Sequence, residues 1–413
     1  MLIDKYIAGR AGLLVGLGLV LLLLSGCATT RLNAARDAFY AGQPGKSIDL
    51  LSEDGGFPSR ERLLLFTERG MAYHRLGEYA KSVVELRRAA DLMAAQEVIS
   101  LSQQASSLVT TEWATEYKGE YCERLWVHTY LMMNYLLLYQ YEDALVEAKQ
   151  ALKIQAGHEE ALRQDYFTRA LIALCYENLR EYNDAYIEYK RLAELLPSPQ
   201  PVAADLYRLA LRLGFADEAA QYGQYLTAGE QASAARPAAE LVLFVGLGRG
   251  PVKVPGNVVV PPSIRFSFPM YRDRPGGAFD LQPVVPAEPM ASAIATDLGV
   301  VARAALDDRK AAMLVKETAR VASKEALARA AGRNGGDAAE ILVRAAFFVL
   351  EEPDTRGWET LPARLLLLRL ALDPEQPEVA VRIIGRHGES IERAVLSDLA
   401  LRSGQRVYRS LRY

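Results

Sequence analysis

The stretch Gly70-Met-Ala-Tyr73-His-Arg-Leu-Gly77-Glu-Tyr79-Ala-Lys-Ser82 decides the fold of this chain. Two tyrosines stand six residues apart, and a small residue follows the second tyrosine after three positions. The same arrangement returns twice, at Tyr135, Tyr141 and Ala144 and again at Tyr176, Tyr182 and Ala185. Because self-similar segments of this kind mark repeat architectures, we expect the chain to stack copies of one helical unit.

Each position of the pattern has a physical role in a pair of packed helices. The small residue lets the second helix approach the first closely, and the aromatic residue fills the wedge at the turn between them. Gly77 can end the first helix in a left-handed conformation. The pattern resembles the tetratricopeptide repeat, a helix pair of about 34 residues. A generic helical bundle with chance periodicity is the alternative, and three copies in register favour the repeat.

Weaker copies extend the array in both directions, at Leu213-Gly214 with Ala219 and at Ala41-Gly42 with Ser47-Ile48. We therefore predict a tetratricopeptide-like α-solenoid over residues 27–231. Stacked pairs of this kind form a superhelix whose concave groove takes an extended peptide or a partner helix.

The copies are not evenly spaced, and the largest gap holds a region rich in aromatic and charged residues. This region, 96–124, adds a further helix pair or a long helix. It carries Trp113, Tyr117 and Tyr121. If these aromatic side chains are exposed, they predict a surface that contacts a partner; the alternative is that they pack against the neighbouring helix.

The chain changes character near residue 232. Short apolar runs follow one another, several alternate as half-buried strands do, and prolines between them suggest strand edges. The predicted strands cover residues 240–245, 252–254, 257–260, 263–268, 363–372, 379–384, 396–401 and 406–411. We predict a β-sandwich-like domain over residues 232–413, with an α-helical insertion at about 290–352. The whole chain is then mainly α with a smaller β part.

The insertion is predicted from an alanine-rich stretch between Met290 and Ala331. Within it, small or apolar residues recur at alternating spacings of three and four, a seam that permits close helix packing. The segment Asp337-Ala-Ala-Glu340 resembles a capping box and is expected to begin a more apolar helix, which runs through Phe347 and Phe348.

The first residues predict a secreted and lipid-modified protein. Lys5 and Arg10 precede an apolar run over 11–24 that has the length of a signal-peptide core but is shorter than the ~20 residues of a spanning helix. The following Leu24-Ser25-Gly26-Cys27 resembles the bacterial lipobox. That resemblance implies a signal peptide over 1–26 and a mature chain whose Cys27 carries a diacylglycerol and an N-acyl lipid. An ordinary secretory signal with an incidental Cys27 is the alternative.

The same resemblance predicts where the protein lies. Several acyl chains anchor a protein stably, because each buried CH₂ contributes roughly 0.8 kcal/mol. Ala28 stands where an aspartate would signal retention at the inner membrane. We therefore expect the protein on the periplasmic face of the outer membrane, with the inner membrane as the alternative.

The composition excludes nucleic acid as a partner. The formal net charge is −3, and this mild balance gives no basic footprint for nucleic acid. Half of the residues are apolar, enough to build sizeable cores.

Two cysteines remain after the lipobox, Cys122 and Cys175, which either form a disulfide in an oxidising compartment or stay as buried thiols. No paired cysteines and histidines predict a metal site, and no cofactor besides the lipid is expected.

No motif of the sequence predicts catalysis. The glycine-rich loop Gly246-Leu-Gly-Arg-Gly250 is followed by Pro251 and a predicted strand. A phosphate cradle requires a helix there, so a hairpin turn is the favoured interpretation. The four histidines are scattered at positions 74, 128, 158 and 387 with no ligand spacing. The chain is not expected to be an enzyme.

The segment Asp354-Thr-Arg356-Gly-Trp358 is the most distinctive one outside the repeats. Arginine and tryptophan are enriched at binding hot spots, so Arg356 and Trp358 are candidate partner-binding residues. The structural alternative, which we favour, is that Trp358 fills the sandwich core while Arg356 pairs with Asp354.

The order of these parts resembles a family of Gram-negative tetratricopeptide-repeat lipoproteins with no assigned activity. The best carriers are Val127-His-Thr-Tyr-Leu-Met-Met-Asn-Tyr135, Gly250-Pro-Val-Lys-Val254 and Asp354-Thr-Arg-Gly-Trp-Glu-Thr-Leu-Pro362. The resemblance implies an architecture and a location. Our hypothesis is a membrane-anchored scaffold that binds envelope proteins through the repeat groove. The alternative is a glycan-contacting subunit of a polysaccharide-export or peptidoglycan machine, motivated by the aromatic residues of 113–121.

Overall fold

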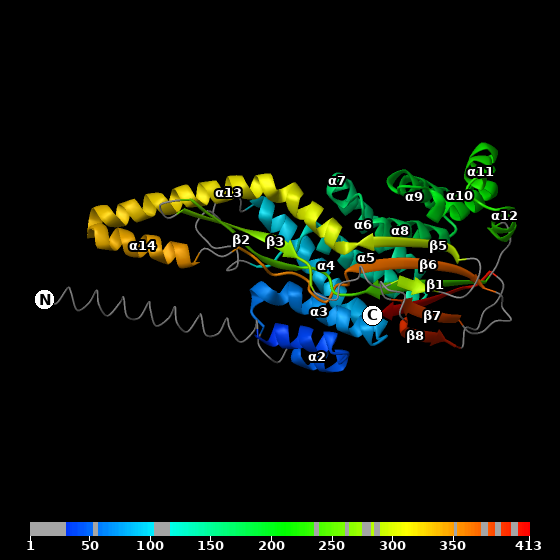
Figure 1. The fold of residues 1–413 in the computed structure, drawn as a ribbon, viewed down its shortest axis with the longest axis horizontal. Coiled ribbons are helices and arrows are strands. Elements are labelled where there is room, and N and C mark those ends of the chain that lie inside the picture. The colour runs from blue at the N-terminus through cyan, green and yellow to red at the C-terminus, as the bar shows by residue number, and fades with distance from the viewer. Residues whose placement is uncertain are drawn as a thin grey trace.

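The computed structural model shows an elongated molecule in which β-strands lie alongside the repeat helices and a helical hairpin projects at one end (Figure 1). It describes residues 30–52, 57–102, 116–234, 239–260, 264–274, 282–284, 290–350, 353–372, 379–384, 390–397 and 404–413. The predicted signal peptide, the lipobox residues Leu24, Ser25, Gly26 and Cys27, and Trp113 lie outside these ranges.

The N-terminal half consists of helices that pack in antiparallel pairs. They are a helix over 30–40, α2 (Pro44–Leu50), the short 3-10 turn η2 (Ser59–Glu61), α3 (Arg62–Arg75), α4 (Tyr79–Ser102), α5 (Tyr121–Leu137), α6 (Tyr141–Gly157), α7 (Glu159–Leu162), α8 (Tyr166–Asn178), α9 (Tyr182–Leu195), α10 (Gln200–Leu213), α11 (Ala216–Gly223) and α12 (Ala228–Ala234). The predicted repeat solenoid is confirmed. The long interval between the copies at Tyr79 and Tyr141 is filled in part by α4, which is longer than the other repeat helices. The shorter interval between the copies at Tyr141 and Tyr182 holds the extra helix α7.

The residues that defined the repeat act as predicted. Three second helices begin at the second tyrosine of their copy, at Tyr79, Tyr141 and Tyr182. The small residues three positions later, Ser82, Ala144 and Ala185, are fully buried. Close contact between paired helices therefore depends on them.

The turn inside each pair uses one left-handed residue. The four equivalent positions are Gly77, Tyr139, Arg180 and Gly214, whose φ angles are 78°, 59°, 63° and 78°. Glycine adopts this conformation freely, whereas a side chain makes it unfavourable. The geometry of the turn is thus kept in the two copies that lack glycine.

In its described residues, the C-terminal half contributes nine strands and a helical hairpin. The strands are β1 (Ala239–Leu247), β2 (Val252–Val260), β3 (Ile264–Arg272), β4 (Gln282–Val284), β5 (Met290–Asp297), β6 (Arg364–Leu372), β7 (Val379–Ile384), β8 (Ser390–Leu396) and β9 (Arg406–Arg412). They form a four-stranded sheet in the order β5-β6-β1-β9, a three-stranded sheet in the order β4-β7-β8, and the separate pair β2-β3. Within the four-stranded sheet only β1 and β9 run parallel.

The four-stranded sheet is covered on both faces. Alternate residues of β1, such as Leu241 and Leu243, join a core with Val381 of β7, so the two sheets pack as the predicted sandwich. The intervening Val242 and Phe244 join the core of the repeat helices instead. Burial on both faces explains why β1 and β6 are nearly continuous apolar runs.

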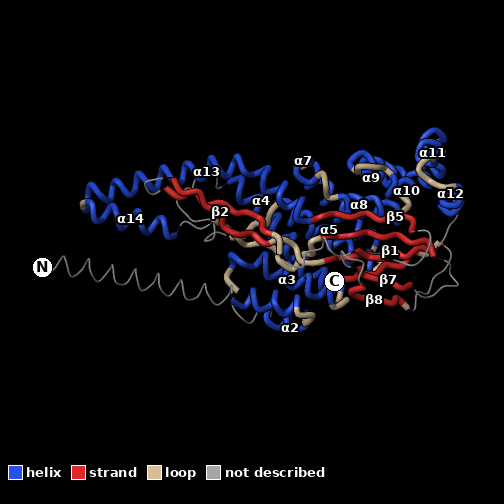
Figure 2. Tube along the Cα trace, in the orientation of Figure 1, coloured by secondary structure: helices blue, strands red, loops and turns tan. Residues whose placement is uncertain are grey.

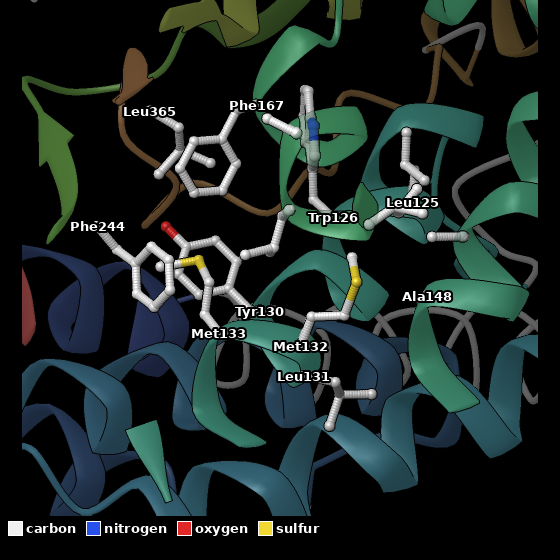
Figure 3. Packing of buried hydrophobic residues seen from close by; sticks show 14 of the residues in the cluster. Leu125, Trp126, Tyr130, Leu131, Met132, Met133, Ala148, Phe167, Phe244 and Leu365 are labelled. Carbon is white, nitrogen blue, oxygen red and sulfur yellow. The ribbon is translucent and has the colours of Figure 1, made fainter. Parts of the chain in front are cut away.

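The sheet lies against the first helices of the repeat pairs, which line the concave side of the solenoid. Strands β5, β6 and β9 contact α10, α8 and α5, and Figure 2 shows the strands running alongside these helices. Tyr130 and Met133 of α5 pack toward Phe244 and Leu365 of the sheet (Figure 3). One core therefore extends across the predicted domain boundary at residue 232.

Two predictions for the second half are wrong in detail. Residues 290–297, predicted as the start of the helical insertion, form β5, because pairing with β6 overrides the helix preference of an alanine-rich stretch. The strand predicted at 396–401 shares Leu396 with the end of β8, and its residues 398–401 lie outside the described ranges. The glycine-rich loop 246–250 is not a hairpin turn, since β1 and β2 belong to different sheets.

The helical insertion itself is a long hairpin. Helix α13 (Leu298–Gly335) is capped by the preceding Asp297, whose carboxylate accepts the N–H of Val300 at 3.0 Å. Helix α14 (Asp337–Leu350) folds back along it. The distal part of α13, together with α14, extends away from the repeats (Figure 1).

Candidate functional site

The segment 353–363 lies along the first repeat pairs and is bound there through its backbone. Glu68 of α3 accepts the N–H groups of Glu359 at 3.1 Å and Thr360 at 3.3 Å. Glu123 of α5 accepts the N–H of Trp358 at 2.9 Å. Two buried carboxylates thus bind the chain's own backbone at residues 358–360, where it enters a turn.

Arg36 holds the same segment from the other side. Its guanidinium donates to Glu68 at 2.7 Å, to the Glu359 carboxylate at 2.8 Å and to the carbonyl of Gly357 at 2.7 Å. Burial disfavours the charge of Arg36, but the two carboxylates outweigh it and hold its pKa above the usual value. The hydroxyl of Tyr40 donates to the carbonyl of Glu359 at 2.5 Å.

The candidate binding residues of this segment face inward. Trp358 is buried; it packs against Tyr130 of α5, with ring centroids 5.7 Å apart, and not inside the sandwich as predicted. Arg356 donates from Nε and Nη2 to the Asp354 carboxylate at 2.8 and 2.7 Å, which confirms the predicted pair. In this arrangement neither side chain offers a partner an open contact.

The aromatic residues of region 113–121 do not form an exposed platform within the described residues. Tyr117 is buried and its hydroxyl donates to Glu123. Tyr121 is half-buried and its ring stacks on that of His158 at 3.5 Å between centroids. Both residues therefore pack against neighbouring parts of the chain, which is the alternative given above, and they do not support the hypothesis of glycan contact.

A cluster of buried charges joins the four-stranded sheet to α8 and α10 of the repeats. Its members are Arg208, Arg369 and Arg406 with Glu177, Asp205 and Glu240. The guanidinium of Arg369, on β6, lies 2.7 Å from Asp205 and 2.6 Å from Glu240. Burial disfavours its charge, but Asp205 and Glu240 outweigh burial and keep its pKa well above the usual value. Three positive and three negative groups thus offset one another at this contact.

A second ionic contact ties β2 and α13 to the repeats. The buried ammonium of Lys253 lies 2.9 Å from Glu120, and Arg309 of α13 pairs with the same carboxylate. Burial opposes ionisation of Glu120, but the two cations outweigh it and hold its pKa at about 2. Glu120 is also the N-cap residue of α5, where it forms a capping box with Glu123.

His74 makes a third contact between the halves. Its ring nitrogens lie 2.6 Å from the Asn134 side-chain oxygen and 2.8 Å from the Ser410 hydroxyl of β9. Burial lowers its pKa to about 4, so the ring is neutral at neutral pH. Sequence reasoning found no role for this histidine, because its partners stand 60 and 336 residues away.

The two remaining cysteines are buried free thiols, so the disulfide alternative is not realised. Burial raises the pKa of Cys122 well above the usual value, which keeps the thiol protonated. Over the part of the chain that is described, no three His, Cys, Asp or Glu side chains are placed to hold a metal ion. The same part contains no helix that is both long and apolar enough to span a bilayer.

One small cavity lies between α5, the start of β2 and residues 357–362. Its volume is about 20 Å³, and Glu123, Lys253 and Trp358 are among its lining residues. This is room for a single water molecule. The cavity belongs to the contact between the halves.

Apolar side chains are exposed at one equivalent position in three repeats. Val84 of α4, Val146 of α6 and Ile187 of α9 each stand five residues after the second tyrosine of their copy, and they are 54%, 53% and 39% exposed. All three lie on second helices, whereas the sheet packs on first helices. We call these residues the outer row.

Comparison with known proteins gives only distant structural likenesses. No family model matches the chain, and no curated protein matches it. Among solved structures, the chain is similar to MamA from Desulfovibrio magneticus RS-1, with 15% identity, a TM-score of 0.34 and coverage of 48% of this chain and 92% of that one. It is also similar to a kinesin light chain of Podosopora anserina with nearly identical TPR-like repeats, with 17% identity, a TM-score of 0.35 and coverage of 48% and 92%. These likenesses concern about half of the chain, and they transfer no function.

Proposed function

We propose that this chain is a non-catalytic scaffold, held on the periplasmic face of the outer membrane through lipid on Cys27, that binds envelope proteins with its repeats. The lipobox-like sequence at 24–27 supports the anchor. Helical repeats of this kind present extended surfaces suited to protein partners.

The observation that carries this proposal is the occupied concave side. There, Glu68 and Glu123 bind the backbone of residues 358–360, and the four-stranded sheet packs on the first helices. The first half of the chain is thus adapted to hold polypeptide, and the polypeptide it holds is its own. A protein partner then binds elsewhere on the repeats, which replaces our expectation of binding in the groove.

The outer row is the surface we assign to that partner. Single exposed apolar residues are normal on protein surfaces. Val84, Val146 and Ile187 differ from such residues because the repeat places them in register, one on each of the second helices α4, α6 and α9. A partner segment that lies across the second helices would contact all three.

The test is site-specific photo-crosslinking in intact cells. A photoreactive amino acid replaces Val84, Val146 or Ile187 in turn, and the control carries it at Leu211 of α10, which is 47% exposed but lies off the row. We expect the same envelope protein to be captured from the three row positions and not from the control. We also expect capture to be lost in the Cys27→Ser chain. If the row positions yield no adduct beyond the control, the outer row is not a partner site.

A further inference from the structure

The distal part of the α13–α14 hairpin, residues 310–350, projects from the body, and we call it the arm (Figure 1). At 1.5 Å per residue, the 38 residues of α13 extend about 57 Å. Gly336 makes the turn into α14 with a φ of 77°. The arm is thus the part of the described molecule that reaches furthest from the repeats.

Only one face of α14 is covered by α13. Arg344 donates to both carboxylate oxygens of Glu325 at 2.6 Å, and it also pairs with Glu340 at 2.8 Å. Ala328 of α13 is buried at this contact. The ion pairs fix which side of α14 turns away.

The face that turns away is apolar, and none of the described residues covers it. Ala338, Ile341, Leu342 and Ala345 lie on it at helical spacing and are all exposed, with Ile341 at 65% and Leu342 at 71%. Exposure of this degree for two adjacent large aliphatic residues is unfavourable in water. A surface that covers them would remove that exposure.

The charge of the arm has the opposite sign to that of the chain. Residues 310–350 contain seven lysines or arginines and four aspartates or glutamates, a net charge of +3, whereas the whole chain carries −3. Helices with an apolar face and basic neighbours bind at the interface of anionic bilayers, where the apolar face enters the acyl boundary and the cations remain among the headgroups.

We propose that the arm docks on the surface of a bilayer that contains anionic phospholipid. The apolar face of α14 enters the interface, and the net positive charge of the arm attracts the anionic headgroups. Helix α14 has 14 residues, fewer than the ~20 needed to span a bilayer, so it lies on the membrane. A second copy of the chain fits this face less well, because two arms of +3 repel each other.

This inference is independent of the protein partner of the outer row. It adds a second membrane contact to the acyl chains proposed at Cys27. Two separated contacts would also fix the orientation of the repeats relative to the membrane.

The test is co-sedimentation of the purified mature chain, made without lipid by Cys27→Ser, with vesicles. One set contains phosphatidylglycerol mixed with phosphatidylcholine, and the other contains phosphatidylcholine only. We expect binding to the anionic vesicles that weakens with added salt, and little binding to the neutral ones. Leu342→Glu should weaken binding on the order of tenfold, because it places an anion where apolar contact is needed. Leu211→Glu, at an exposed aliphatic residue off the arm, should leave binding unchanged.

Circular dichroism and sedimentation velocity complete the experiment. Both variants should keep the helical signal of the parent chain, since both positions are exposed. Absence of binding, or equal binding to both kinds of vesicle, would overturn the proposal. A dimer of the parent chain that Leu342→Glu dissolves would also overturn it and would assign the face to a second copy.

Discussion

Thr360 donates twice to one carboxylate oxygen of Glu68, from its N–H at 3.3 Å and from its hydroxyl at 2.5 Å, across 292 residues of sequence. The same carboxylate receives Arg36. A buried side chain of the first repeats therefore binds the segment that leads into the central strand β6. This contact makes the stability of the repeats depend on the second half of the chain.

The first prediction concerns this carboxylate. Glu68→Gln removes the charge that pairs with the buried Arg36, and breaking a buried pair from one side costs about 3 kcal/mol or more. Thr360→Val removes two hydrogen bonds, the one its hydroxyl donates to Glu68 and the one it accepts from Nε1–H of Trp358, and should cost about 2 kcal/mol. The measurement is the free energy of unfolding from urea titration. Glu78→Gln is the matched control, because Glu78 forms an exposed pair with Lys81 whose loss should leave stability nearly unchanged. Equal effects of Glu68→Gln and Glu78→Gln would contradict the structural role assigned to Glu68.

The second prediction is that acid weakens the contact between Glu120 and Lys253. The Glu120 pKa is about 2 in the folded protein, whereas an unfolded glutamate titrates near ~4.3. A group whose folded pKa is depressed stabilises the fold above the unfolded pKa, and this stabilisation is lost as pH falls through the folded pKa. Stability should therefore decline between about pH 4.5 and pH 2, by roughly 3 kcal/mol from this group.

The variant Glu120→Gln separates this group from the other carboxylates. At neutral pH it should lower the free energy of unfolding, since Lys253 then remains buried without its partner. Between pH 4.5 and pH 2 its stability should change less steeply than that of the parent chain. Urea titrations at several pH values measure both quantities, and an unchanged acid slope would show that Glu120 is not its source.

The repeat half could be predicted from sequence because its signals are local. A tyrosine, a glycine and a small residue within one helix pair specify how the pair packs, and Gly77 and Ser82 act as their spacing indicated. The β5 strand could not be predicted in this way. Its sequence has the composition of a helix, and only pairing with the distant β6 makes it a strand.

The occupied groove was beyond sequence reasoning for the same reason, yet one signal of it was present. Arg369 interrupts the apolar run of β6. A single charge inside a buried element must have a partner of opposite charge. The sequence thus indicates that buried ion pairs exist but not which residues complete them, since Asp205 lies 164 residues from Arg369.

The third prediction concerns Gly70, where the first and second helices of a pair approach closely. A Cβ atom there would lie 2.8 Å from Cγ and Cδ2 of the fully buried Leu86. Alanine favours a helix over glycine by up to about 1 kcal/mol, but overpacking a buried contact costs about 1–3 kcal/mol. Gly70→Ala should therefore destabilise the protein. Gly45→Ala is the matched control, because a Cβ at Gly45 in α2 meets nothing and should be neutral or slightly stabilising. Thermal unfolding of both variants compares them, and stabilisation by Gly70→Ala would show that Leu86 can move aside.

The last prediction follows from the left-handed turn that the repeats share. Arg180 has a φ of 63° and an exposed side chain, so its conformation is unfavourable and its side chain contributes little packing. The left-handed conformation costs an L-residue roughly 1–2 kcal/mol, whereas glycine loses about 0.5–1 kcal/mol more backbone entropy on folding. Arg180→Gly should therefore stabilise the protein by up to about 1 kcal/mol. Gly214→Ala makes the reverse change at the equivalent turn. Because a Cβ there would meet no other atom, this variant isolates the backbone effect and should destabilise the protein by a similar amount. Opposite signs for the two variants in urea titration would establish the shared turn, whereas a loss of stability in both would mean that Arg180 makes a contact worth more than its strain.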